Sequence, residues 1–131
     1  MPKSLFHSCF IRRSIFLLFF VIISVWIGYD VKQQCLDARR EYDTQDCVEA
    51  LITLLDDDHR GFRVRNHAIW ALGQLGDIRA LPTLQKYYTG NIPEREPLDK
   101  TISQYELKKA VNLAAGGFNM TAVFWRYNIN K

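Results

Sequence analysis

Four residues, Arg63, His67, Trp70 and Gln74, have a spacing that brings their side chains together on one side of a helix. Steps of four, three and four residues place them in one stripe, beside the apolar face of that helix. A tryptophan in this position needs a partner that covers it. Because tryptophan and arginine are frequent anchors of protein interfaces, the stripe predicts a binding surface for another protein. The alternative is that the aromatic C-terminal residues, or the segment after the first apolar run, cover Trp70.

The sequence offers no grouping of residues that predicts catalysis or a bound metal. His59 and His67 lie eight residues apart across a turn, and Cys47 is distant in sequence, so a zinc site built from them is speculative. The acidic run at residues 56–58 has no glycine or glutamate at EF-hand spacing and is typical of a solvated turn that caps helices. We therefore expect no catalytic residues, no metal and no cofactor, and predict that the protein is not an enzyme.

Charge divides the chain of 131 residues at Asp30. All 14 acidic residues lie at or beyond this point, whereas the preceding residues hold none. Acidic and basic residues are equal in number from Asp30 onward, so this part of the chain is neutral. A neutral domain lacks the positive surface that non-specific binding to nucleic acid requires. Nucleic acid is therefore not an expected partner.

The run from Ser14 to Tyr29 carries no charge and predicts a membrane anchor. As a helix it would span roughly 24 Å, against a hydrocarbon core of about 30 Å. Trp26 and Tyr29 at its end suit the interface between lipid and water. The sequence thus predicts a basic N-terminal tail (1–13), a transmembrane anchor (14–29), a juxtamembrane helix or connector (30–42) and a soluble domain (43–131).

Two alternatives to an uncleaved anchor remain open, a cleaved secretory signal and a buried core helix. The small residues that signal cleavage requires are missing around Gly28. Basic residues are balanced on the two sides of the run, and only the terminal amine favours an N-terminus in the cytoplasm. The side of the membrane that holds residues 30–131 stays open. Cys35 and Cys47 would be reduced in the cytoplasm and could pair outside it, and their spacing does not decide between these states.

The soluble part predicts four helices, since apolar residues recur at steps of three and four within each of them. The expected ranges are 46–55, 62–75, 79–88 and 103–115. Val64 shares an apolar face with Ala68 and Ala71 on the second helix, and the small alanines allow another helix to approach closely. The end of the chain, residues 118–131, is β-prone and rich in aromatic residues. We interpret it as a cap that folds back over exposed helix faces.

The chain contains an internal echo. The stretch Ala50-Leu51-Ile52-Thr53-Leu54 recurs thirty residues later as Ala80-Leu81-Pro82-Thr83-Leu84, with four of five residues identical. A period near thirty indicates a helical solenoid. The stretch VEALITLLDDDHRGFRVRNHAIWALGQLGDIRALPTLQKYY resembles the HEAT repeat, in the shorter bacterial variety known from phycobilisome bilin lyases. The resemblance is carried by the aspartates of the turn, Val64 and Arg65, Ala68, the runs Ala71-Leu72-Gly73 and Leu75-Gly76-Asp77, and Ala80-Leu81-Pro82 with Leu84.

This resemblance implies an all-α fold, a short α-solenoid of antiparallel helix pairs that begins after Asp43. It also implies a structural role for Arg65, which in similar repeats pairs with an aspartate such as Asp77. One HEAT-like metalloenzyme, deoxyhypusine hydroxylase, uses His-Glu pairs where this chain has Asn66 and His67. A lone imidazole cannot supply paired ligands for a di-iron centre, so that activity is excluded.

We therefore predict a single-pass membrane protein that displays a truncated, capped HEAT-like domain as a scaffold for other proteins. A stable stack usually requires about three repeats, and this chain has one full unit and two partial ones. Self-association through the incompletely buried stack is one further interpretation. Another is an accessory subunit of a lyase-type enzyme that holds a small ligand in a helical groove. That groove would be lined by Gln45, Glu49, Thr53, Thr83 and Lys86.

Overall fold

One helix, α1 (Lys3–Glu41), forms the first third of the computed structural model, which describes residues 3–129 and their side chains from residue 11 onward. The expected tail, anchor and connector are, within these residues, a single unbroken helix of 39 residues. The change in polarity at Asp30 alters which side chains meet water, but it does not interrupt the backbone hydrogen bonds of the helix. The first two residues of the expected tail lie outside the described residues.

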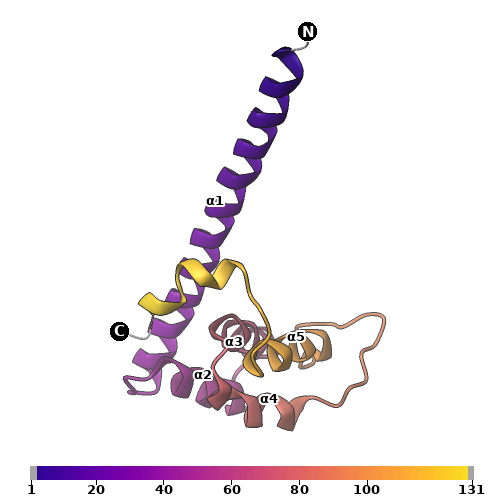
Figure 1. Ribbon diagram of the computed structural model, residues 1–131. Helices are drawn as coiled ribbons and strands as arrows, with labels where there is room; N and C mark the ends of the chain where they lie inside the picture. The colour runs from indigo at the N-terminus through magenta and orange to yellow at the C-terminus, as the bar shows by residue number, and fades with distance from the viewer. Residues whose placement is uncertain (1–2, 130–131) are drawn as a thin grey trace.

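The N-terminal part of α1 projects away from the rest of the molecule (Figure 1). Its large apolar side chains are exposed, as Phe16 at 75% and Leu17 at 67% illustrate. The C-terminal part of the same helix is packed, with Val31, Cys35 and Ala38 buried. By length and composition, α1 is able to cross a membrane.

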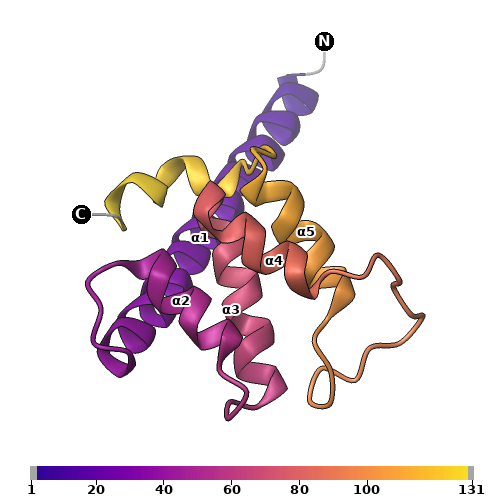
Figure 2. The same ribbon diagram turned by 90° about the horizontal axis from the view of Figure 1, so that it is seen from below.

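Four further α-helices gather around the C-terminal part of α1 (Figure 2), and no strand forms within the described residues. They are α2 (Cys47–Asp56), α3 (Phe62–Leu75), α4 (Leu81–Tyr87), which follows the 3-10 turn η1 (Ile78–Ala80), and α5 (Gln104–Ala114). Local capping explains why the four expected helices are confirmed to within about two residues. Asp46 and Ser103 accept hydrogen bonds from the first turns of α2 and α5, and Gly76 ends α3 at φ 61°.

Helix α3 lies at the centre and packs against α1, α2 and α5. Its Ile69 and Leu72 are fully buried. The contact with α5 is close, because a Cβ atom added at Gly73 would lie 2.9 Å from the Cα atom of Ala110. The expected tight pairing of α3 therefore depends on small residues. Val64 was expected on the buried face but is 43% exposed, since it lies in the first turn of α3, at the edge of the packed region.

Ion pairs join α2 to α4 at both ends, in agreement with the thirty-residue echo. Arg79 donates to Asp77 over 2.9 Å and to Asp46 over 2.8 Å, and these two aspartates are the N-caps of η1 and α2. We call them the N-cap aspartates. At the other end, Lys86 Nζ contacts Asp56 Oδ1 over 2.9 Å. The two helices thus lie with their corresponding ends together.

The guanidinium of Arg79 also changes the acidity of both aspartates. Hydrogen bonds from Arg79 hold the pKa of Asp77 below its usual value. Burial alone would raise the pKa of Asp46, but hydrogen bonds from the Glu49 N–H and from Arg79 lower it. The two carboxylates are thus stabilised in their charged form, and the pKa of Arg79 is raised in turn by its hydrogen bonds to Asp77 and Asp46.

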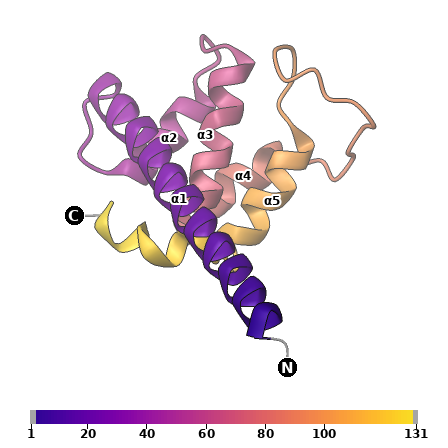
Figure 3. The same ribbon diagram turned by 90° about the horizontal axis from the view of Figure 1, so that it is seen from above.

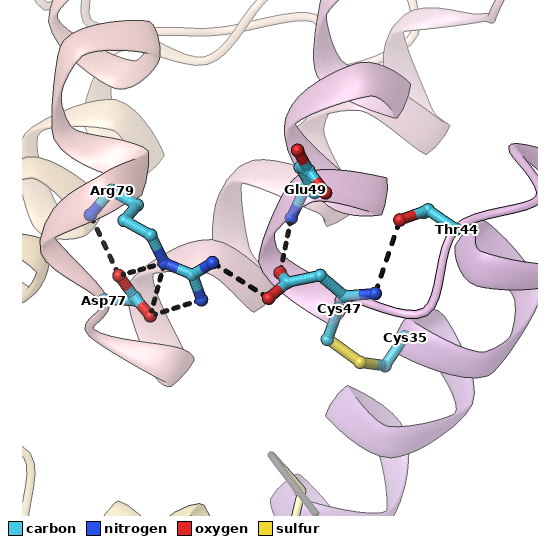
Figure 4. Close-up of a disulfide and its surroundings, with 7 residues drawn as sticks. Cys35, Thr44, Cys47, Glu49, Asp77 and Arg79 are labelled. Carbon is cyan, nitrogen blue, oxygen red and sulfur yellow. Dashed lines mark hydrogen bonds and ion pairs between the residues drawn. A yellow bond between two sulfur atoms is a disulfide. The ribbon is translucent and has the colours of Figure 1, made fainter.

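A disulfide between Cys35 and Cys47 links α1 to the first residue of α2 (Figure 4). The two Cα atoms lie 5.1 Å apart, within the range that disulfides require. Both residues are buried. The start of α2 is therefore held covalently to α1 by the disulfide, and it is held to η1 by the ion pair between Asp46 and Arg79.

The C-terminal segment, residues 118–129, forms two short 3-10 helices, η2 (Thr121–Phe124) and η3 (Arg126–Asn128), where the sequence predicted β-prone structure. Packing explains the difference, because Trp125 lies on α1 and a Cβ atom at Gly28 would come within 2.6 Å of its ring. The segment crosses α1 between the free part of that helix and α2–α5 (Figures 1 and 3). It folds back over the helices as expected, but it covers α1 rather than Trp70.

Candidate groove between α1 and α3

A groove of about 550 Å³ opens where α1 leaves the other helices. Side chains from α1, α3, the loop after α4 and α5 form its walls. They are Trp26, Asp30, Arg63, Asn66, His67, Trp70, Leu98 and Glu106. Three of the four residues of the predicted binding stripe therefore lie in one concave surface.

The walls of the groove are held together by a contact between His67 and Asp30. The atoms His67 Nε2 and Asp30 Oδ2 are 3.1 Å apart, and both side chains are partly exposed. Because an ionised carboxylate only accepts hydrogen bonds, Nε2 carries the proton in this contact. The ring of His67 also lies 5.2 Å from the ring of Trp70, tilted by 46°. The helical step of three residues thus places both rings in the groove, with His67 tied to α1.

The aromatic side chains of the groove are only partly covered. Trp26 is 64% exposed on α1, and Trp70 on α3 is half-buried. Arg63 is exposed and has no ion pair within the described residues. An indole surface next to an available guanidinium is the combination that recurs at the energetic centres of protein interfaces.

Asn66 has a structural role at the edge of the groove. Its Nδ2 donates to the carbonyl oxygens of Leu98 and Thr101, over 3.1 and 2.9 Å, and its Oδ1 accepts from the N–H of Ser103 over 2.8 Å. The buried amide thereby fixes the loop between α4 and α5. Sequence reasoning missed this function because all three partners lie more than thirty residues away.

Gln74, the fourth residue of the predicted stripe, is not part of the groove lining. Its Oε1 accepts from Asn119 Nδ2 over 2.8 Å, and its backbone oxygen accepts from Arg126 Nη2 over 2.8 Å. Both partners belong to the C-terminal segment. The segment therefore covers the end of the stripe and leaves Trp70 and His67 to the groove.

The acidic turn after α2 makes structural contacts. Tyr42 donates to Asp57 over 2.7 Å, and burial together with this hydrogen bond raises the pKa of Tyr42 to about 12. Arg65 donates to the carbonyl oxygen of Leu55 over 2.8 Å and lies 3.4 Å from Asp58. The implied pairing of Arg65 with Asp77 was wrong, because a different residue holds that aspartate, as described above. Within residues 11–129, whose side chains the structure describes, no group of three or more histidine, cysteine or acidic side chains is placed to hold a metal ion.

The residues of the alternative ligand groove contact their neighbours instead of forming a described cavity. Gln45 accepts from Arg39 over 2.8 Å, and Thr53 donates to the carbonyl oxygen of Glu49 over 2.9 Å. Lys86 is occupied by the ion pair with α2.

The all-helical architecture of the described residues and the ion pair between Asp56 and Lys86, thirty residues apart, are typical of a helical-repeat protein. The family model for HEAT repeats matches residues 29–95, just over half of the 131 residues, and the chain belongs to the HEAT repeat family. HEAT repeats generally mediate interactions between proteins. Neither the curated proteins nor the solved structures contain a match to this chain.

The match begins within α1, whereas the sequence pattern predicted a repeat domain that begins at residue 43. Its first residues include the buried Val31, Cys35 and Ala38, which pack the end of α1 into the core. The packed part of α1 therefore belongs to the repeat region. The antiparallel pairing of a solenoid and the narrower bilin-lyase variety stay predictions.

Proposed function

We propose that this protein is a membrane-anchored scaffold without catalysis of its own, and that it binds another protein in the groove between α1 and α3. The observation that carries the proposal is the position of the groove. Partly exposed Trp26 and Trp70 face a common hollow at the point where the apolar helix leaves the repeats. A partner held there would lie next to the membrane.

The packing of α1 supports an anchor that stays attached. His67 contacts Asp30 of α1, and Trp125 packs on Gly28 of the same helix. Cleavage after Gly28 would remove the surface that covers the buried Trp125, and it would leave Asp30, the partner of His67, as the second residue of the remaining chain. A signal sequence that is cut off has no comparable role in the mature fold.

The disulfide supports a location for the soluble part. Disulfides form and persist in oxidising compartments and are rare in the cytoplasm. Cys35 and Cys47 both follow the apolar run, so the bond supports a topology with the soluble part on the oxidising side of the membrane and the N-terminus on the cytoplasmic side. Alkylation of intact cells and of denatured extracts with a maleimide mass tag tests this topology. Tagging of Cys35 and Cys47 only after reduction is the expected result, and tagging without reduction would contradict it.

The chemistry of the groove specifies the partner segment. Its volume of about 550 Å³ admits a few side chains rather than a whole helix face. The two indoles favour an apolar or aromatic anchor, and Arg63 favours a carboxylate next to that anchor. We therefore propose a short segment of a membrane protein that carries an aromatic and an acidic residue close together.

A photo-crosslinking amino acid at Leu98, a 47% exposed side chain of the groove lining, tests the proposal in the full-length protein in its native membrane. The expected result is a discrete crosslinked product, which Trp70→Ala abolishes without loss of helical circular dichroism. The matched control is Ile78→Ala, which truncates a 62% exposed apolar side chain on η1, outside the groove lining. Equal crosslinking in both variants would contradict the proposal. Loss of helical signal in Trp70→Ala would instead assign this residue to the core.

A further inference from the structure

The C-terminal segment exposes an unusual number of apolar side chains. Five large ones are more than half exposed, while Ala122 and Trp125 are buried. The exposed side chains are Phe118 at 79%, Met120 at 58%, Val123 at 56%, Phe124 at 62% and Tyr127 at 81%. Exposed apolar side chains gathered in one segment are typical of a surface that contacts another protein or a membrane.

The segment also carries little charge. Between residues 116 and 129, Arg126 is the only charged residue. Its guanidinium is bonded to the backbone oxygen of Gln74 at the end of α3 and so is turned toward the protein. No carboxylate in the segment would oppose the anionic phosphates at a membrane surface.

Contacts with α1 show which part of that helix the C-terminal segment lies beside. The rings of Phe124 and Phe20 meet edge to face, with their centroids 6.0 Å apart. Phe20 lies nine residues before Tyr29, which corresponds to about 13 Å along the helix axis. Farther along α1, Trp125 covers Gly28. The ring of Phe124 is thus level with the middle of the apolar run that we propose to be in the membrane, and Trp125 is level with its end.

From these observations we infer that the C-terminal segment is a second membrane contact, which lies where the interfacial layer meets the acyl chains. Trp125 is at the interfacial end of the apolar run, and Val123 and Phe124 point toward the acyl chains. The inference rests on the proposed anchor, because the lipid reaches this height only if α1 enters the bilayer. The direction of the segment agrees with this role, since it crosses α1 instead of running alongside it (Figures 1 and 3).

The interfacial layer, rather than the hydrocarbon core, fits the backbone of the segment. The 3-10 turns satisfy only some of its backbone groups, such as the N–H of Asn128, which donates to Trp125 over 3.0 Å. The hydrocarbon core requires every backbone group to be satisfied within the protein, whereas the interface still supplies water and lipid oxygen atoms. Aromatic side chains are enriched at this depth.

Depth-dependent fluorescence quenching of the full-length protein in phosphatidylcholine vesicles tests the inference. A polarity-sensitive dye is attached to a cysteine introduced as Val123→Cys, in a Cys9→Ser background that leaves the Cys35–Cys47 disulfide intact. Two sites provide the controls. Phe16→Cys reports on the exposed face of the apolar run, and Gln85→Cys reports on the exposed side of α4, at the far end of the molecule (Figure 1).

We expect spin-labelled lipid to quench the dyes at positions 16 and 123, and aqueous iodide to quench the dye at position 123 several-fold less than that at position 85. If iodide reaches positions 123 and 85 equally while lipid quenches position 16, the anchor stands and the second contact is refuted. If lipid quenches neither 16 nor 123, the anchor fails and the inference fails with it. Protection of position 123 from both quenchers would also overturn the inference, since a protein surface would then cover the segment.

Discussion

Removal of the Cys35–Cys47 disulfide should lower the stability of the domain by an amount that its loop length sets. The bond closes a loop with a sequence separation of 12 residues. In the chain-entropy description, the open loop gives the unfolded state additional freedom worth about 3 kcal/mol. For a domain of this size, each kcal/mol changes the melting temperature by roughly 4–8 °C, so the loss of about 3 kcal/mol predicts a decrease of roughly 12–24 °C.

The assay is thermal unfolding of the full-length protein in detergent micelles, followed by far-UV circular dichroism with and without reductant. The variants Cys35→Ala, Cys47→Ala and the double replacement should show similar losses, because either single replacement already breaks the bond. Reductant should lower the stability of the wild type and leave that of all three variants unchanged. Coincident melting of the oxidised and reduced wild type would refute the argument, and so would additive effects of the two replacements.

Three further predictions concern packing, charge and the loop. Gly73→Ala should destabilise the domain by about 1–2 kcal/mol, because the added Cβ atom clashes with the backbone of α5 and this clash outweighs the gain in helix propensity. The measurement is urea unfolding, and the control is Gly61→Ala, where no atom lies within 4 Å of the added Cβ atom. Arg79→Met should lower the free energy of unfolding at neutral pH by less than about 1 kcal/mol, since Arg79 is half exposed. The pKa values of the N-cap aspartates are lower in the folded state than in the unfolded state. The stability difference between the wild type and Arg79→Met is therefore fully present above the unfolded pKa of about 3.9, and it disappears as the pH falls through the folded pKa values. A stability difference that persists in acid would contradict this prediction. Asn66→Ala should cost about 2–4 kcal/mol and speed proteolysis of the loop between α4 and α5, and unchanged cleavage would argue against its role as a loop clamp.

Local signals in the sequence predicted the soluble helices well. The observed bounds of α3 agree with the predicted ones, because the helix ends where Gly76 adopts a left-handed conformation. This signal comes from a residue next to the helix and can be read without knowledge of the packing. The continuity of α1 was not predicted, because the change in polarity at Asp30 was interpreted as a boundary between segments. No residue at this point breaks a helix, so the backbone continues. The 3-10 turns of the C-terminal segment were missed for a different reason. Their conformation depends on Gly28, which is distant in sequence.

The candidate site was also predicted only in part, namely for the residues on α3. The helical period brings Arg63, His67 and Trp70 together in the groove, as their spacing predicts. The opposite wall, with Trp26 and Asp30, could not be predicted, since it depends on how α1 packs against α3. Sequence periodicity describes one face of one helix and carries no information about the element that meets it.

The unbroken course of α1 has a mechanical consequence. The helix begins in the apolar run and ends inside the repeat core, where the disulfide ties it to α2. A helix without a proline or a flexible linker transmits tilt and rotation along its whole length, so the repeats cannot rotate freely relative to the apolar run. If α1 spans the bilayer, the groove keeps a fixed height and a fixed orientation relative to the bilayer. A change in the tilt of α1, such as one caused by thinning of the membrane, would then change the position of the groove as well.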